Sequence, residues 1–182
     1  MKVAGIDYSM SSPSITILNN GIIDGIFCIK ATKKQAVNNP LITLLEYPVY
    51  KNNMERFDKL STMMLNLIPE DIDVAYIEDY SFASSSGMAF TIAECTMLFK
   101  YKITQKFNIE LGVVAPKQVK KYATGTGNAK KRQMVDQFKL EQFDIYESFG
   151  LIDDNLEKIK SPIDDICDSY FIAKYAYNQV IL

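Results

Sequence analysis

Three aspartates lie close together in the stretch from Ser161 to Asp168, which reads SPIDDICD. One interpretation is a helix start, because Ser161 is a good N-cap, Pro162 suits the first helical position and acids suit the first turn. The other is a metal site, because gathered carboxylates bind hard cations such as Mg²⁺ or Mn²⁺. Taken alone, the stretch favours capping. A helix start needs only one acid, however, so the surplus negative charge requires compensation.

Spacing along a helix does not decide which of the three aspartates would bind a metal. Asp164 and Asp168 are four residues apart, Asp165 and Asp168 are three apart, and both pairs share a helix face. With Ser161 as N-cap, Asp164 occupies the third helical position, from which an acceptor reaches back to the cap amide. We therefore predict that Asp164 supports the helix start, and that Asp165 and Asp168 face a metal.

Two further acids stand where predicted strands end. The apolar run at 3–6 stops at Asp7, and a predicted strand at 73–77 leads to Glu78. Sites in α/β proteins form at the carboxyl ends of strands, so these acids converge if their strands are neighbours. Four carboxylates around one or two divalent ions would form a phosphodiesterase site, in which the ions activate water and clamp the phosphate. Taken singly, each acid is more typical of an ordinary strand end.

The segment from Leu111 to Val135 contains no acid. Its six basic residues predict a phosphate-binding stripe, although a solvated basic face is the ordinary alternative. The basic residues are Lys117, Lys120, Lys121, Lys130, Lys131 and Arg132. Beside a carboxylate metal centre the stripe becomes the better interpretation, because polyanionic DNA needs cations around such a centre. The glycines in Thr124-Gly125-Thr126-Gly127 let backbone amides approach a phosphate.

Composition narrows the chemistry and the class of protein. The chain has 182 residues, of which 48% are hydrophobic, and it has no histidine. A histidine general base, a catalytic triad that contains histidine and a metal site with histidine ligands are therefore excluded. Its three cysteines are widely spaced in apolar contexts and indicate reduced core thiols. Without a signal-peptide core or a long apolar run, we expect a cytoplasmic protein with no membrane segment, folded as a single domain over 1–182. The frequent Lys, Asn, Ile and Tyr residues indicate an AT-rich genome, so we expect the cytoplasm to be that of a bacterial cell or a phage-infected host.

The patterning predicts an α/β fold with a five-stranded mixed sheet flanked by helices. Strands are expected at 3–6, 14–18, 22–29, 73–77 and 111–115. The first three are expected to be antiparallel because Asn20-Gly21 favours a hairpin, and the last two parallel. The segment 31–53 contains two prolines and predicts a long irregular connection. Helices are expected at 54–67, 87–107, 117–122 and 129–143, and from Pro162 onward; patterning over 145–160 is weak.

The predicted helix at 87–107 has two apolar stripes. One contains Ile92, Cys95, Phe99 and Ile103, and the other contains Phe90, Met97 and Tyr101. Two such stripes fit either a central helix buried on both sides or a surface helix that forms a dimer interface. The sequence leaves both interpretations open.

Four segments together resemble the RuvC-type Holliday-junction resolvases of the RNase H-like superfamily. They are GIDYS around Asp7, YIEDYSF around Glu78, APKQVKKYATGTGNAKKRQM from Ala115, and DICDSYFIA from Asp165. The third is the most specific, since it joins a basic helix, a Gly-x-Gly turn and a second basic helix. The first segment departs from the family pattern, because Tyr8-Ser9-Met10 stands where the family usually has a glycine.

The resemblance implies an RNase H-like domain and assigns Asp7, Glu78, Asp165 and Asp168 as catalytic metal ligands for Mg²⁺, with Mn²⁺ as a substitute and two ions in the site. It further implies phosphate contacts by Lys120 and Lys131, and a base-stacking aromatic that is either Tyr80 or Phe82. By the same resemblance the protein is a homodimer that binds four-way DNA and nicks two strands symmetrically in recombination and repair, leaving 5′-phosphate ends.

Three rival functions deserve comparison. Sugar kinases and actin-like ATPases share the Gly-Ile-Asp start, but they need two such domains and glycine-rich nucleotide loops. A non-catalytic nucleic-acid adaptor with an RNase H-like core would not need the complete acidic set. A nuclease acting on flaps, forks or structured RNA would use the same residues, and so remains an alternative substrate class.

Overall fold

Short apolar runs and a hairpin turn build one mixed sheet in this computed structural model, which describes residues 1–30, 37–80, 86–149 and 161–181. Its strand order is β4-β3-β2-β1-β5-β6. The strands are β1 (Lys2–Asp7), β2 (Ser14–Asn19), β3 (Ile22–Lys30), β4 (Ile42–Glu46), β5 (Val74–Glu78) and β6 (Leu111–Val114). The pairs β1–β2 and β2–β3 are antiparallel and β5–β6 is parallel, as the sequence predicted. The pair β1–β5 is parallel as well. Asn20 and Gly21 form the β2–β3 turn with positive φ angles of 50° and 81°.

The described part of the chain has six strands, where the sequence predicted five. The additional strand is β4, which lies in the segment predicted to be irregular and pairs in parallel with β3, Ile26 opposite Ile42. Pro40 and Pro48 flank this strand and do not interrupt it. An edge strand needs partners on one side only, so the prolines limit its length without preventing the pairing.

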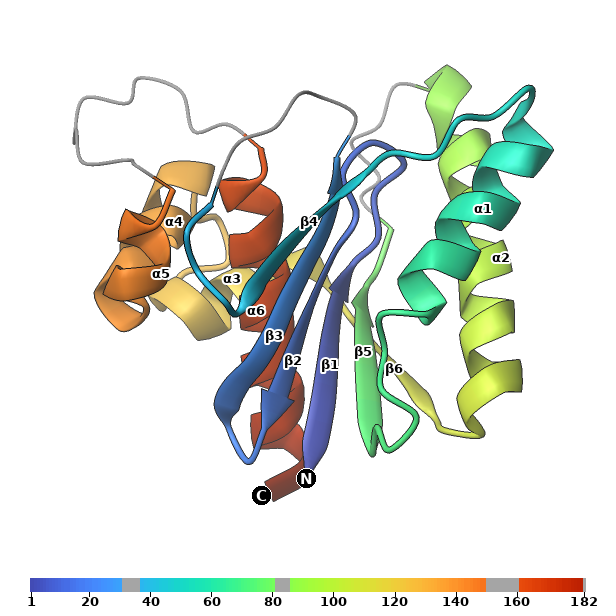
Figure 1. The fold of residues 1–182 in the computed structure, drawn as a ribbon. Coiled ribbons are helices and arrows are strands. Elements are labelled where there is room, and N and C mark those ends of the chain that lie inside the picture. The colour runs from blue at the N-terminus through green and yellow to red at the C-terminus, as the bar shows by residue number, and fades with distance from the viewer. Residues whose placement is uncertain (31–36, 81–85, 150–160, 182) are drawn as a thin grey trace.

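Helices cover both faces of the sheet (Figure 1), so the protein has three layers. The helices are α1 (Asn53–Leu65), α2 (Ser86–Phe107), α3 (Pro116–Thr124), α4 (Lys131–Glu141), α5 (Phe143–Glu147) and α6 (Ile163–Ile181). Helices α1 and α2 pack on one face around Phe57 and Phe99, and α3 to α6 pack on the other around Phe138 and Phe171. The helix predicted over 129–143 is therefore divided, because α4 ends at Glu141 and α5 begins at Phe143.

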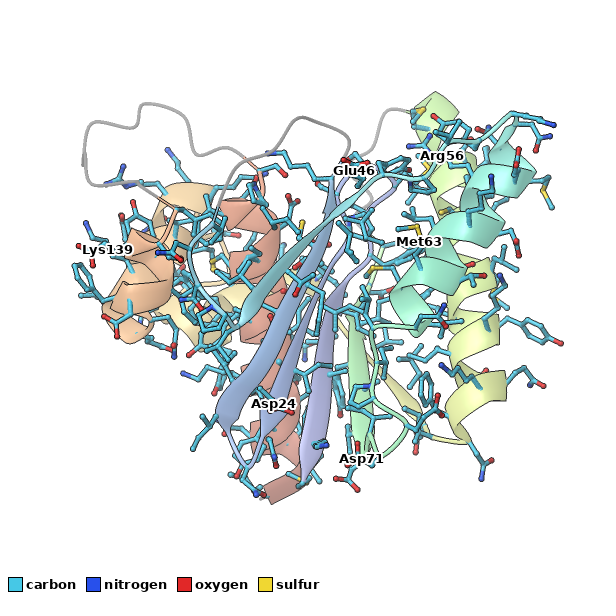
Figure 2. All side chains as sticks on the ribbon, viewed as in Figure 1. Asp24, Glu46, Arg56, Met63, Asp71 and Lys139 are labelled. Carbon is cyan, nitrogen blue, oxygen red and sulfur yellow. The ribbon has the colours of Figure 1, made fainter. Side chains whose placement is uncertain are left out.

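Asp7 lies at the end of the sheet opposite the N-terminus. Figure 2 shows Asp24 and Asp71 at the end where the N-terminus lies, and Glu46 and Arg56 at the opposite end. Strand β1 runs from the first end to the second, so Asp7 comes at the end that Glu46 and Arg56 mark (Figures 1 and 2).

Candidate metal centre and nucleic-acid interface

Asp7 and Glu78 are brought together by the pairing of their strands. Strand β1 runs parallel to β5, with Ile6 opposite Ile77, so the next residue of each strand is one of the two acids. The carboxyl ends of parallel neighbours meet at one edge of the sheet. The predicted convergence of Asp7 and Glu78 is therefore confirmed.

Helix α6 adds its aspartates because it packs unusually close to β1 and β2. Gly5 faces the helix backbone, and a Cβ built on it would lie 2.1 Å from the amide nitrogen of Ala173. The buried hydroxyl of Ser169 lies 2.9 Å from both the Ser14 and the Thr16 hydroxyls on β2. A glycine and a buried hydroxyl cluster thus set the position of α6, and Asp168 immediately precedes this contact.

The acids influence one another electrostatically. Burial raises the pKa of Asp7 well above its usual range, and the negative charges of Asp168, Glu78, Asp165 and Asp164 raise it further. Burial and the Glu78 charge raise the pKa of Asp168 to about 7, against the opposing effect of Lys131. Burial raises the pKa of Glu78 to about 7 as well, with Lys120 acting in the opposite direction. Mutually repelling carboxylates of this kind are stabilised by protons or by cations.

The start of α6 differs from the capping prediction. The helix begins at Ile163, one residue later than Pro162, and the Ser161 hydroxyl donates to Asp165 at 2.5 Å. Asp164 instead accepts a hydrogen bond from the Lys131 ammonium group at 2.8 Å. The prediction that Asp164 supports the helix start is therefore wrong. Because the helix begins one residue later, Asp165 makes the contact with Ser161.

Asp164 is the residue that sequence reasoning left out of the acidic centre. Only 8% of its surface is exposed, and its Oδ1 atom is buried with no hydrogen-bond partner among the described residues. A buried carboxylate oxygen without a partner is costly unless a ligand satisfies it. Its spacing of four residues from Asp168 agrees with this position, but Asp165 shares a helix face with Asp168 as well, so the sequence carries no signal that separates the two.

A cavity of about 140 Å³, which we call the basic cavity, joins the acids to the basic stripe. Glu78, Asp164 and Asp168 line it from one side, and Lys120 on α3 and Lys131 on α4 line it from the other. Hydrogen bonding to Asp164 raises the pKa of Lys131 and keeps its ammonium group charged. The cavity thus combines an acidic wall with two cations, as a phosphate-binding metal centre requires.

The other predicted basic residues do not line this cavity. Lys117, Lys121, Lys130 and Arg132 are exposed on α3, α4 and the turn between them, and Arg132 pairs with Asp136 at 2.8 Å. Gly125 has a φ of 81° and its amide donates to the Lys121 carbonyl. It therefore serves as the end of α3.

Of the two predicted stacking aromatics, Tyr80 follows Glu78 by two residues, and the Lys100 ammonium lies 4.6 Å from the centre of its ring. Phe82 lies outside the described residues.

The acids fit a divalent cation in the chemistry of their donor atoms. All are oxygen donors, they raise one another's pKa values, and Asp164 carries an unsatisfied oxygen. In the described residues no three acids or cysteines stand close enough together to hold a metal ion as they are placed. Binding would therefore require carboxylate side chains to rotate toward the ion.

Helix α2 presents one apolar stripe to the core and the other to solvent. Cys95, Phe99 and Ile103 are completely buried, whereas Phe90, Met97 and Tyr101 are 79%, 58% and 57% exposed. The alternative of a helix buried on both sides within one chain is therefore wrong. Apolar side chains exposed along one face are typical of a protein–protein contact.

Comparison with known proteins identifies the fold. No family model matches the sequence, and no curated protein matches it. The solved structure of Thermus thermophilus RuvC in complex with a Holliday junction substrate superimposes with a TM-score of 0.63 at 14% identity, over 99% of this chain and 96% of that one.

Two resolvases from other organisms show the same similarity. Fowlpox virus resolvase in complex with substrate Holliday junction DNA gives a TM-score of 0.55 at 16% identity, with both chains fully covered. The yeast mitochondrial Holliday junction resolvase Ydc2 gives 0.54 at 17%, over 99% of this chain and 84% of that one. This chain therefore has the fold of these resolvases, an RNase H-like α/β fold. None of its described helices is long and apolar enough to cross a membrane.

Proposed function

We propose that this protein is a Mg²⁺-dependent, structure-selective DNA endonuclease that resolves four-way junctions by paired, symmetric nicks. The observation that carries the proposal is the meeting of Asp7, Glu78 and the α6 aspartates, with Lys120 and Lys131 on the facing wall. Branched DNA is the favoured substrate because the structures that share this fold are named as Holliday junction resolvases.

Asp7, Glu78, Asp165 and Asp168 would hold the ions, and Asp164 supplies a further oxygen at the same wall. Two Mg²⁺ ions, or Mn²⁺ in their place, would supply activation of the attacking water and neutralisation of charge on the phosphate. Lys120 and Lys131 bind the phosphate oxygens and orient the backbone in the cavity. The products are a 5′-phosphate and a 3′-hydroxyl.

The other predicted contacts surround this centre. Lys117, Lys121, Lys130 and Arg132 extend the positive surface along the DNA backbone, and their contribution depends on salt concentration. Tyr80 or Phe82 contacts bases that the junction leaves unstacked.

The proposal is tested by nicking of labelled four-way, flap, fork and linear duplex DNA in Mg²⁺. We expect the wild type to nick four-way DNA preferentially, and Asp7→Asn and Asp168→Asn to lower the rate by more than about 100-fold, since loss of an outer partner of a metal ligand alone costs 10- to 100-fold. Asp24→Asn is the control, because Asp24 is an exposed acid at the other end of the sheet.

Each alternative function gives a different result. Preferential cleavage of flaps, forks or structured RNA would indicate a nuclease with another substrate. Binding of branched DNA without cleavage in any divalent metal would indicate a non-catalytic adaptor. Undiminished cleavage by both aspartate variants would refute the metal-site assignment.

Symmetric nicking requires two active sites, and the exposed α2 stripe is the surface that we assign to the homodimer contact. Replacing Phe90 and Met97 together by aspartate should convert the dimer to a monomer in sedimentation analysis and replace paired nicks by single ones. Leu140→Asp is the control, since Leu140 is 80% exposed on α4, across the sheet from α2. A wild-type protein that is monomeric at micromolar concentration would contradict this assignment.

A further inference from the structure

Asp165, one of the proposed metal ligands, is held by contacts that come from outside its own helix. The Ser161 hydroxyl, in the turn before α6, donates to the Oδ2 atom of Asp165 at 2.5 Å. Ser12, in the loop after β1, is a second hydroxyl partner: burial raises the pKa of Asp165, and hydrogen bonds from Ser161 and Ser12 lower it. Two separate segments therefore fix the orientation of this carboxylate.

Ser161 is itself held by Lys30, the last residue of β3. The Lys30 ammonium group donates to the Ser161 carbonyl, a contact between residues 131 positions apart in the sequence. The hydroxyl and the carbonyl of Ser161 thus have different partners, and the residue links Lys30 to Asp165. Both links involve an ionised group, and hydrogen bonds of that kind are stronger than neutral ones.

The sheet explains why Lys30 reaches this position. Cys28 packs in the core on the α6 face of the sheet, and Ile29 packs in the core on the opposite face. Side chains alternate along a strand, so Lys30 extends from the same face as Cys28. Cys28 is opposite Ser14 on β2, and Ser14 is opposite Asp7 on β1. The Lys30 side chain therefore starts at the acidic edge of the sheet, on the face that α6 covers.

The surroundings of Lys30 differ from those of Lys120 and Lys131. Those two lysines line the basic cavity, whereas Lys30 is bound to a backbone carbonyl beside the acids. Its charge is felt there, since burial raises the pKa of the Cys28 thiol, the Asp165 charge raises it further and the Lys30 charge lowers it. A cation in the cavity wall is placed to meet a phosphate, but a cation bound to the backbone is placed to hold that backbone.

We propose that Lys30 and Ser161 are positioning residues of the metal centre, and that Lys30 acts through Ser161 to hold the Asp165 carboxylate in the orientation that binds an ion. This inference rests on the proposed nuclease function. A carboxylate has about four acceptor sites, so the hydroxyl contacts leave others for a cation. Partners of this kind orient metal ligands, and their loss typically lowers metal affinity about 10- to 100-fold.

The first test is Mn²⁺ binding measured by calorimetry on the protein without DNA. Ser161→Ala and Lys30→Met should each weaken Mn²⁺ binding by about 10-fold or more, because each breaks one link to Asp165. Ser161→Thr keeps a hydroxyl and Lys30→Arg keeps a cationic donor, so these two variants should retain an affinity within about threefold of the wild type. Thermal unfolding identifies the variants that are folded at the temperature of the measurement.

Two matched controls lose the same kinds of group elsewhere in the chain. Ser148→Ala removes a hydroxyl that donates to the Ile145 carbonyl at 2.7 Å. Lys106→Met removes an ammonium group that donates to the Leu65 carbonyl at 3.3 Å. Neither contact lies in the acidic centre, so both variants should bind Mn²⁺ as the wild type does.

A double-mutant cycle tests whether Lys30 acts through Ser161. If it does, adding Lys30→Met to Ser161→Ala should lower the Mn²⁺ affinity by less than about threefold, because the link through which Lys30 acts is already lost. Adding Ser161→Ala to Asp165→Asn should likewise have little effect. Independent residues would instead give losses that multiply.

Binding of four-way DNA without divalent metal separates positioning from a phosphate contact. Lys30→Met should keep the DNA affinity of the wild type and its salt dependence, whereas Lys131→Ala should reduce the salt dependence by about one phosphate contact. A reduced salt dependence in Lys30→Met with unchanged Mn²⁺ affinity would identify Lys30 as a phosphate contact and overturn the proposal.

The outcomes also separate this inference from the proposed function. Wild-type Mn²⁺ affinity in both Ser161→Ala and Lys30→Met, or losses that multiply in the cycle, would overturn the positioning role while the nuclease function stands. A wild type that neither binds Mn²⁺ nor nicks branched DNA would overturn both.

Discussion

Replacing Gly5 by alanine should disrupt the protein at the contact that positions its acids. The new Cβ would meet three backbone atoms of α6, at 2.1, 2.4 and 2.5 Å, where ordinary contact begins at about 3.4 Å. Backbone atoms cannot turn aside as a flexible side chain does. The helix must therefore move away from β1, or the strand must distort.

The expected cost follows from this geometry. Overpacking a core by one methyl group costs about 1–3 kcal/mol, and three backbone clashes put Gly5→Ala at about 3 kcal/mol or more. That is a large fraction of the about 5–15 kcal/mol that stabilises a domain. Because Asp168 lies next to Ser169 in the same contact, a shift of about 1 Å in α6 should also lower nicking by about 100-fold.

Urea unfolding followed by circular dichroism measures the first effect, and junction nicking at a temperature where the variant stays folded measures the second. Gly87→Ala is the control, since a Cβ there meets nothing within 4 Å. It should leave the unfolding free energy unchanged or raise it by up to about 1 kcal/mol. Equal stability of Gly5→Ala and wild type would refute the close packing of α6 on β1.

Three further predictions concern the acids and cations. With a chelator present, stability should fall as the pH rises from 4.5 to about 7, because Glu78 holds its proton longer in the folded state than in the unfolded chain. Glu78→Gln should reduce this slope in thermal unfolding, with Asp168 supplying part of the remainder, and an unchanged slope would count against the raised pKa of Glu78. Asp164→Asn should weaken Mn²⁺ binding in calorimetry by about 10- to 100-fold. If only Asp165→Asn lowers the Mn²⁺ affinity, Asp164 is not a metal ligand and serves only as the partner of Lys131. Lys131→Ala and Lys117→Ala should each reduce the salt dependence of DNA binding by about one phosphate contact, but only Lys131→Ala should slow nicking strongly. Equal nicking rates in the two would contradict the placement of Lys131 at the cleaved phosphate.

Sequence reasoning reached Asp7 and Glu78 because each follows an apolar run that is short enough to be a strand. It reached α6 because its apolar residues recur at helical spacing. Both signals are local, since they depend on the periodicity of side chains along one segment. The antiparallel β2–β3 pairing is equally local, because Asn20-Gly21 specifies the turn between adjacent strands.

Local periodicity could not predict the hydrogen-bond partners of Asp164 and Asp165. Asp164 pairs with Lys131, thirty-three residues earlier, and Asp165 takes the Ser161 contact because α6 begins at Ile163. Successive side chains of a helix point about 100° apart, so a start that is one residue later changes which aspartate lies beside Ser161, and the pattern alone cannot assign these roles. Strand β4 was missed for a similar reason, because its pairing depends on a free edge of β3 and not on its own sequence.

The aspartates of SPIDDICD show which properties of the site come from the sequence and which come from the tertiary structure. Their type, number and helical spacing, with Asp7, Glu78 and the acid-free basic segment, are properties of the sequence, and these predict a carboxylate centre beside cations. Only the tertiary structure decides that Asp164 belongs to the wall of the basic cavity, that two of the six basic residues line it, and that the Lys30 ammonium group reaches the Ser161 carbonyl. Local periodicity sets which face of an element a side chain occupies, whereas the close packing of α6 on Gly5 sets what that face meets.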